Sequence, residues 1–253
     1  MAIAAARYGW LPDLPDQRDH LFAAAPGVLT ELPRSVDLRP ECPPVYDQGD
    51  INSCTANAIA AAVEFDLMRE KLDSFMPSRL FIYWNERVIE HSTKSDSGAH
   101  IRDGIKSVAK AGYCPETDWP YAAADLYTEP STAAVDKAKP HHITSYQRVA
   151  RDLAQMKGCL ASGYVFAFGF TVYNSFESEQ VRKSGELDMP QQGESVIGGH
   201  AVVAVGYDDS DQRFIVRNSW GDKWGLAGYF TMPYAYLTQR SLSSDFWRIS
   251  VAR

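Results

Sequence analysis

The spacing of hydrophobic residues divides the chain into a helical first half and a strand-rich second half. Apolar residues recur at helical spacing over about 53–72, and two further helices are predicted over about 78–91 and 101–111. Ser78 suits the N-cap of the second, and Gly112 ends the third. Alanines are frequent in the first of these helices, so we expect it to be buried and closely approached by its neighbours.

After about residue 139 the pattern changes. One more helix is predicted over about 147–161, and apolar and β-branched runs bounded by turn residues follow it. Helices first and strands later indicate an α+β fold. The predicted strands cover residues 164–170, 200–207, 213–218, 228–232 and 246–251.

Residues 1–31 differ from both halves. The run from Trp10 to Asp19 is punctuated by prolines and is therefore expected to be extended, and residues 23–27 resemble a linker. Two interpretations stand side by side. The segment is either a surface arm packed by Trp10 and Leu14 or an arm that lies across a cleft.

Charge and composition exclude several classes of protein. The 253 residues carry a net charge of -7, without basic clusters, so no nucleic-acid partner is expected. No apolar run approaches the roughly 20 residues of a membrane span. Residues 1–6 lack the basic lead of a signal peptide, which predicts a cytoplasmic protein or one secreted by a non-classical route, with the compartment itself left open.

The first candidate for chemistry is the segment from Gln48 to Cys54. Cys54 opens the first predicted helix, and the partial positive charge of a helix N-terminus stabilises a thiolate. Gln48 lies six residues earlier and supplies an amide that can donate hydrogen bonds. A nucleophile and a donor for a developing oxyanion are two parts of an acyl-transfer site. Taken alone, Cys54 would be a small buried hydrophobic residue.

The other cysteines do not indicate a disulfide framework. Three remain beside Cys54, and no C-x-x-C motif is present. Free buried thiols are expected, although a bridge from Cys114 to Cys42 or to Cys159 stays open. His141 and His142 have no metal-ligand spacing with these cysteines, so we predict no metal and no other cofactor.

Two later segments complement the first. His200 heads a predicted buried strand, and Asn218 begins the sequence Asn-Ser-Trp-Gly-Asp-Lys-Trp-Gly. A cysteine nucleophile needs a base, and the base needs a third group that fixes its ring.

These three segments resemble the papain-like cysteine proteases. Gln-x₅-Cys, then Gly-His-Ala-Val, then Asn-Ser-Trp-Gly-x-x-Trp-Gly occur in that family's order, and the resemblance covers about 32–251. It implies a two-lobe α+β fold with the active-site cleft between the lobes. Residues 32–253 would form the catalytic domain, with a helical left lobe over about 45–140 and an antiparallel, β-barrel-like right lobe over about 141–253.

The resemblance also implies roles for single residues. Cys54 would be the nucleophile, His200 its partner, and Asn218 the group that orients the imidazole. The Gln48 side chain and the Cys54 backbone N–H would form the oxyanion hole, and Trp220 would shield the His200–Asn218 hydrogen bond from water. Residues proposed to contact an extended peptide substrate are Ser97, Gly98, Ala99, Gly199 and Trp220. Gly98 could instead be only a turn glycine, and Trp220 only a core aromatic.

The chain departs from the family pattern at Ile51, three residues before Cys54, at Thr55, directly after it, and in the loop 97–99, which lacks Asn-Gly-Gly. These departures indicate a divergent, disulfide-poor branch, bacterial in character. The residue at the base of the main specificity pocket is expected within 242–245. Asp245 there would favour Lys or Arg substrates, and Leu242 would favour apolar ones.

The function expected is therefore a cysteine peptidase that acts as a monomer on peptides or proteins through an acyl-enzyme. Two alternatives remain open: a catalytically weak peptide-binding protein on a protease fold, and an amidase or acyl transferase with the same triad. Residues 1–31 are far shorter than the helical propeptides common in the family. We predict that this N-terminal extension lies near the cleft and lowers activity, with a purely structural arm as the alternative.

Overall fold

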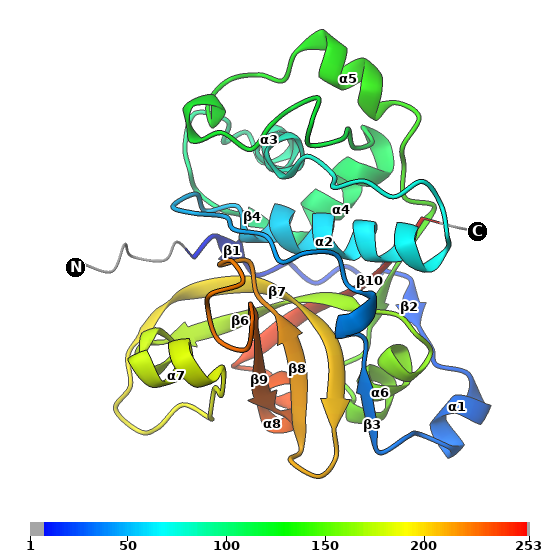
Figure 1. Ribbon diagram of the computed structural model, residues 1–253, viewed down its shortest axis with the longest axis vertical. Helices are drawn as coiled ribbons and strands as arrows, with labels where there is room; N and C mark the ends of the chain where they lie inside the picture. Colours follow the sequence, from blue (N-terminus) through cyan, green and yellow to red (C-terminus); the bar gives the residue numbers. More distant parts are fainter. Residues whose placement is uncertain (1–7, 252–253) are drawn as a thin grey trace.

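Helices and sheet separate into two lobes in the computed structural model, which describes residues 8–251. One lobe holds the long helix and its neighbours, and the other is built on a large sheet (Figure 1). The expected α+β two-lobe fold is confirmed. The α-helices are α1 Pro26–Thr30, α2 Cys54–Arg69, α3 Arg79–Ile89, α4 Ile101–Lys110, α5 Thr132–Ala138, α6 Leu153–Ala161, α7 Glu179–Ser184 and α8 Tyr234–Thr238.

Helix α2 lies between the two lobes (Figure 1). Every residue from Cys54 to Leu67 is buried, which explains the many alanines: small side chains let β7 on one side, and α3 and α4 on the other, approach its backbone. Helix α3 begins as its sequence predicts, because Ser78 Oγ accepts a hydrogen bond from the backbone N–H of Phe81 at 3.1 Å.

The sheet of the second lobe has eight strands in the order β2-β5-β10-β6-β7-β8-β9, with β3 paired to β7. Within the described residues this path stays open, so the expected barrel-like lobe is an open sheet and not a closed barrel. The strands are β1 Trp10–Leu11, β2 Leu21–Phe22, β3 Ser35–Asp37, β4 Ala99–His100, β5 Ser145–Val149, β6 Phe166–Tyr173, β7 Val196–Asp208, β8 Arg213–Arg217, β9 Tyr229–Pro233 and β10 Ser243–Ser250.

One predicted helix is partly wrong. The sequence 147–161 contains the end of β5 and then α6, which begins only after Asp152. Asp152 is the N-cap, since its side chain accepts a hydrogen bond from the backbone N–H of Gln155 at 2.9 Å. Pairing of β5 with β10 and β2 decides the strand conformation, and this pairing is invisible in the local pattern.

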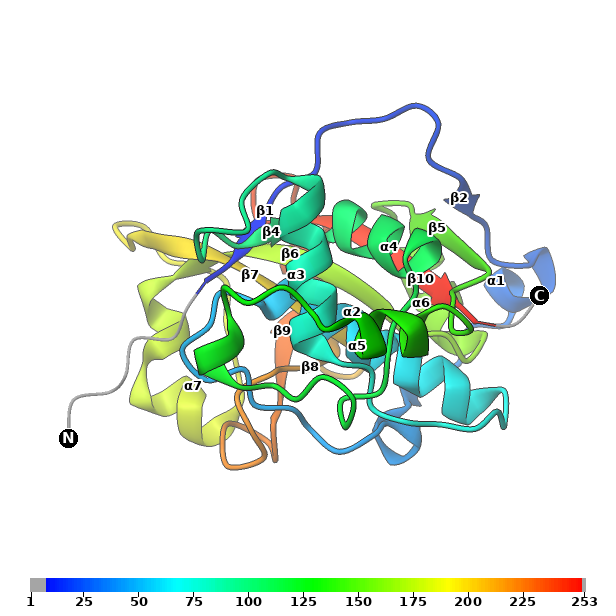
Figure 2. The same cartoon turned by 90° about the horizontal axis from the view of Figure 1, so that it is seen from above.

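The N-terminal segment passes from one lobe to the other. Its β1 pairs in parallel with β4 beside the helical lobe, and its β2 pairs in parallel with β5 of the sheet (Figure 2). We call residues 8–22 the arm. Within the described residues no helix is long and apolar enough to cross a membrane. All four cysteines are free, as expected.

Candidate active site

Cys54 is the first residue of α2 and is fully buried. The preceding Ser53 makes no side-chain cap to the helix, and its hydroxyl instead lies 2.6 Å from the hydroxyl of Tyr121. The first N–H groups of α2 are therefore not capped by that side chain, and they contribute positive potential at the thiol. The backbone of Ala201, from β7, also acts to lower the pKa of the Cys54 thiol.

His200 and Asn218 face each other across β7 and the end of β8. His200 Nε2 lies 2.8 Å from Asn218 Oδ1, and both residues are buried. The backbone N–H of Ser219 donates to the same Oδ1 at 2.8 Å, which fixes which end of the amide is oxygen. Because Oδ1 only accepts, Nε2 of His200 carries the hydrogen, and Nδ1 of the neutral ring carries the lone pair. Asn218 thus selects a tautomer in which Nδ1 can act as a base.

Aromatic rings cover this pair. The Trp220 ring lies 5.0 Å from that of His200, and Phe176 packs 5.1 Å from Trp220, centroid to centroid. Trp224 closes the cluster at 5.2 Å from Trp220. Such cover excludes water and lowers the local dielectric, which strengthens the His200–Asn218 hydrogen bond. This geometry supports a shielding position for Trp220 and a core position for Trp224.

Gln48 connects the two lobes. Its Oε1 accepts a hydrogen bond from Ser219 Oγ at 2.6 Å, and its Nε2 donates to the carbonyl of Ile51 at 2.9 Å. Its backbone N–H donates to the Ser219 carbonyl at 2.9 Å. The amide is fully buried and has a fixed orientation beside the start of α2. Ile51, one of the departures from the family pattern, is buried here and contributes its carbonyl.

Thr55, the second departure, has its own partner. Its hydroxyl donates at 2.8 Å to Glu86 Oε2 of α3. Burial raises the pKa of Glu86 well above its usual value, which favours the protonated carboxyl behind Cys54.

The arm passes directly over Cys54. Gly9 is the residue at the narrowest point, because a side chain there would place its Cβ 1.8 Å from the carbonyl oxygen of Asn52. From the other side, Ala99 donates its N–H to the Gly9 carbonyl at 2.7 Å. Gly98, with φ +76°, comes so near that its own Cβ would lie 2.0 Å from that carbonyl oxygen. The backbone of Gly9 also lies close enough to the Cys54 thiol to lower its pKa.

Tyr8 and Trp10 lie on either side of Gly9 along the arm. The Tyr8 ring lies edge-on to His200 at 6.0 Å, and its hydroxyl donates to Glu177 at 2.6 Å. The Trp10 indole fills the space that Gly169 of β6 and Gly199 of β7 leave open, since a Cβ on either would meet its ring. Its Nε1 donates to Asp245 Oδ2 at 3.2 Å.

Burial beneath the arm changes the protonation of both reactive groups. It raises the pKa of Cys54 to about 12 and lowers the pKa of His200 to about 4. Neighbouring N–H groups partly oppose the first shift, and the Asn218 hydrogen bond partly opposes the second. Both shifts favour a neutral thiol beside a neutral imidazole, whereas an ion pair is the reactive form of such a couple.

The candidate residues that were identified from the sequence therefore lie close together. Cys54, His200, Asn218 and Gln48 lie together, and Gly98, Ala99, Gly199 and Trp220 line the path of the arm; the Ser97 hydroxyl turns back to the Gly98 carbonyl at 3.3 Å. Sequence reasoning missed the roles of further residues that hold the arm, because no local signal connects them. These are Tyr8, Gly9, Asp13, Asp19, Arg102 and Arg148.

Metal-ligating side chains gather in one group among the described residues. Glu90, His100 and Asp103 place their ligand atoms within 4.8 Å of one another, at the junction of α3, β4 and α4. His100 Nδ1 lies 3.0 Å from Glu90 Oε1, and the His100 backbone N–H donates to the same oxygen at 2.7 Å. These contacts account for Glu90 and His100 as a hydrogen-bonded connection between the helices.

Comparisons with known proteins agree with this geometry. A family profile described as papain family cysteine protease matches residues 32–244. An uncharacterized peptidase C1-like protein of Acanthamoeba polyphaga mimivirus is 42% identical over 96% of this chain and 86% of its own. Cysteine proteinase 1 of Entamoeba histolytica is 31% identical over 80% of this chain and 64% of its own. The crystal structure of xylellain, a cysteine protease from Xylella fastidiosa, has 45% identity and a TM-score of 0.94, and it covers 98% of this chain and 97% of its own.

Proposed function

Because the chain belongs to the papain family of cysteine proteases and is a cysteine peptidase, we propose that it hydrolyses peptide bonds with Cys54 as nucleophile and His200 as base and acid. The observation that carries this proposal is the tautomer set by Asn218. With Nε2 bound to Asn218 Oδ1 at 2.8 Å, the His200 lone pair is left on Nδ1. That nitrogen is the one available to a thiol.

The chemistry proceeds in two halves. The Cys54 thiolate attacks the carbonyl carbon, and the oxyanion is held by the Cys54 backbone N–H and the amide of Gln48. His200, protonated by the thiol, gives its proton to the leaving amine, and an acyl-enzyme remains. Water then attacks the thioester, with His200 taking a proton from it, and the acid product and free thiol are released. Asn218 holds the imidazolium in position throughout.

We propose further that the arm keeps the enzyme at rest. Cys54 and His200 are both 0% exposed, so a substrate cannot reach them while Gly9 and Tyr8 stay in place. Burial also holds the couple in its neutral, unreactive form. Moving the arm admits water and substrate together, and it removes the cause of both pKa shifts.

Replacing the nucleophile tests the peptidase proposal. Cys54→Ala should lower hydrolysis of a fluorogenic peptide library by at least about a thousandfold in the full chain. Cys159→Ala is the matched control, because Cys159 is equally buried but lies in α6. Both variants are also made in a Gly9→Ala background, so that a slow wild type does not hide the result. Equal hydrolysis by the Cys54→Ala and Cys159→Ala chains would contradict the proposal.

The two alternatives predict different results. A peptide-binding protein would bind library peptides without a covalent Cys54 adduct to a thiol-directed epoxide. An acyl transferase would incorporate an added amine into peptide product faster than it hydrolyses the peptide, which mass spectrometry resolves.

A further inference from the structure

Two arginines, one from each lobe, hold the carboxylates of the arm. Arg102 of α4 places its guanidinium 2.6 Å from Asp19, and Arg148 of β5 places its own 3.1 Å from the same oxygen. The side chain of Asp13 is fully buried beside them, with Oδ1 accepting from the Arg102 backbone N–H at 3.2 Å and Oδ2 from Trp247 Nε1 at 2.9 Å. The donors therefore converge from α4, β5 and β10.

The balance of charge depends on the arm. With the arm docked, the cluster contains the carboxylates of Asp13, Asp19 and Asp245 and two guanidiniums. Asp245 belongs to β10 and binds Arg148 at 2.7 Å, whereas the other two carboxylates leave with the arm. Two guanidiniums would then share a single carboxylate, and a positive, donor-rich site would face the cleft.

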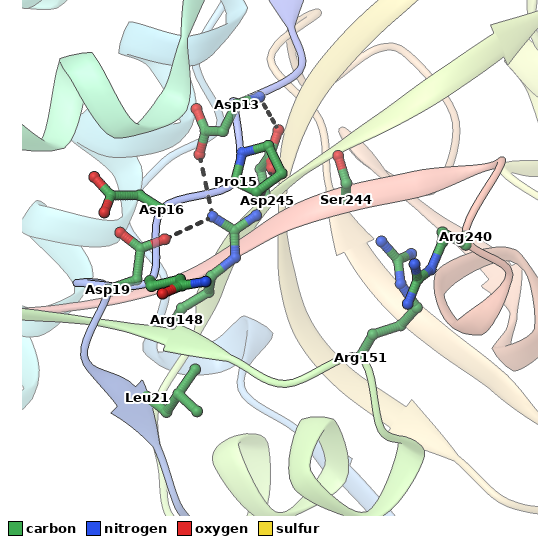
Figure 3. Close-up of a pocket in the computed structure, with 11 residues that line it drawn as sticks. Asp13, Pro15, Asp16, Asp19, Leu21, Arg148, Arg151, Arg240, Ser244 and Asp245 are labelled. Atoms are coloured by element: carbon green, nitrogen blue, oxygen red, sulfur yellow. Dashed lines mark hydrogen bonds and ion pairs between the residues drawn. The ribbon is translucent and has the colours of Figure 1, made fainter.

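The surroundings increase this positive character. Arg148 lines a pocket of about 580 Å³ together with Arg151 and Arg240 (Figure 3). Among residues 8–251, neither Arg151 nor Arg240 lies within ion-pair distance of a carboxylate. Arg151 instead donates to the Leu237 and Gln239 carbonyls at 3.5 and 3.4 Å.

We propose that Arg102, Arg148 and the Trp247 indole form a subsite for an acidic side chain of the substrate once the arm has moved, so that the enzyme prefers acidic peptides. This rests on the proposed peptidase function and the resting arm. The occupant is a peptide because the site continues the groove in which an extended peptide, the arm itself, already lies. Asp13 is four residues from Gly9, which faces Cys54, so the acidic residue lies within about five positions of the scissile bond.

The side chain recognised is a carboxylate and not an amide. Guanidinium and indole N–H groups are all donors, and Asn or Gln would leave one of them opposite an NH₂ group. Charge-assisted hydrogen bonds of this kind, largely shielded from water, are about twice as strong as neutral ones. The arm itself presents Asp19 to both guanidiniums.

Paired peptides measure this preference in the full-length Gly9→Ala chain. Quenched fluorescent peptides of one sequence carry Asp or Asn at each position from two to five residues on either side of the scissile bond. We expect kcat/KM for the Asp peptide to exceed that for its Asn partner by about tenfold at one position. Arg102→Gln and Arg148→Gln should each reduce this ratio to about two or below.

Arg39→Gln is the control for net charge, because Arg39 pairs with Asp37 on the surface, at 2.7 Å, outside this cluster. It should keep the tenfold ratio. Thermal melting checks that each variant is folded, and two separate arginines guard against the failure of one. An Asp-to-Asn ratio near one at every position, or a ratio unchanged in both arginine variants, would overturn the subsite.

Binding distinguishes this failure from failure of the peptidase proposal. The same peptides, labelled and titrated by fluorescence anisotropy into the Gly9→Ala, Cys54→Ala chain, report affinity without chemistry. Tighter binding of the Asp peptide, lost in Arg102→Gln, supports the subsite even if the active chain cleaves no peptide. Equal binding of Asp and Asn peptides removes the subsite even if both are cleaved.

Discussion

Two stretches of the arm are held by different physical means. Residues 8–11 are held by shape: Gly9 fits where a methyl group does not, and the Trp10 indole fills a space opened by two glycines. Residues 13–19 are held by charge at Asp19, which pairs with Arg102 and Arg148, and by the hydrogen bonds that the buried side chain of Asp13 accepts. The first stretch covers Cys54. The second stretch lines the pocket that Arg148 also lines (Figure 3).

The difference indicates a division of labour. A closely packed contact is lost in a single step when a side chain is added, because a backbone carbonyl cannot move away from a new Cβ. Charge pairing responds in graded steps to a lost carboxylate or to pH. The shape-held stretch therefore blocks the site, and the charge-held stretch sets how readily the block is released.

The largest effect is expected at the shape-held stretch. Gly9→Ala should raise the rate of Cys54 alkylation by iodoacetamide, and kcat/KM with it, by about a hundredfold, since overpacking at such a site costs about 3 kcal/mol. Gly27→Ala is the control, because no atom lies within 4 Å of a Cβ at that position. Equal alkylation of the two variants would show that Gly9 does not hold the arm over Cys54.

A smaller effect is expected at the charge-held stretch. Asp19→Asn removes the carboxylate shared by Arg102 and Arg148, and it should raise the same alkylation rate by about tenfold, as for loss of a charged hydrogen bond. Asp16→Asn is matched to it, because Asp16 pairs only with the exposed Arg18 and should change little. Similar rates of Cys54 alkylation in Asp19→Asn and Asp16→Asn would show that the ion pairs of Asp19 do not hold the arm.

The third effect, of about the same size as that of Asp19→Asn, is a pH dependence. Burial, then the charge of Asp245, raises the pKa of Asp13 to about 6 in the docked arm. Asp13 therefore binds its proton more tightly in the docked arm than in the free arm. Protonation of Asp13 stabilises docking fully below about pH 4, and this stabilisation is lost as the pH rises through 6. Between pH 5 and 7 the opening equilibrium of wild type, relative to that of Asp13→Asn, should rise about tenfold.

Amide hydrogen exchange of Trp10 and Leu11 reports this equilibrium in both chains without using the activity. Burial lowers the pKa of His200 to about 4, so docking shifts its titration in the opposite direction to that of Asp13. Because His200 is present in both chains, its contribution cancels when the opening equilibrium of wild type is divided by that of Asp13→Asn. A ratio independent of pH would mean that Asp13 does not ionise on release.

Local patterns predicted the elements well where one interaction dominates. The first three helices follow from periodicity and from the Ser78 cap, and the candidate site residues come from three motifs that resemble those of the papain-like family. Prediction failed at residues 147–149, which pair with β10 and β2 as strand although a helix was expected. The strand there depends on partners about 100 residues away in sequence, for which a single sequence carries no local signal.

By itself the sequence predicted the candidate chemistry of this protein: a cysteine at a helix start, a histidine placed at the head of a strand, and two amides beside them. In the structure Cys54 does begin α2, whereas His200 is the fifth residue of β7, which begins at Val196. These groups lie in motifs whose function depends on residue type and local conformation. Only the tertiary structure decided where the arm lies. Its contacts join Trp10 and Asp13 to Asp245 and Trp247, more than 230 positions away, and Asp19 to Arg102, 83 positions away. Side chains this far apart in sequence become neighbours only when both lobes have folded, because burial and charge pairing act through space.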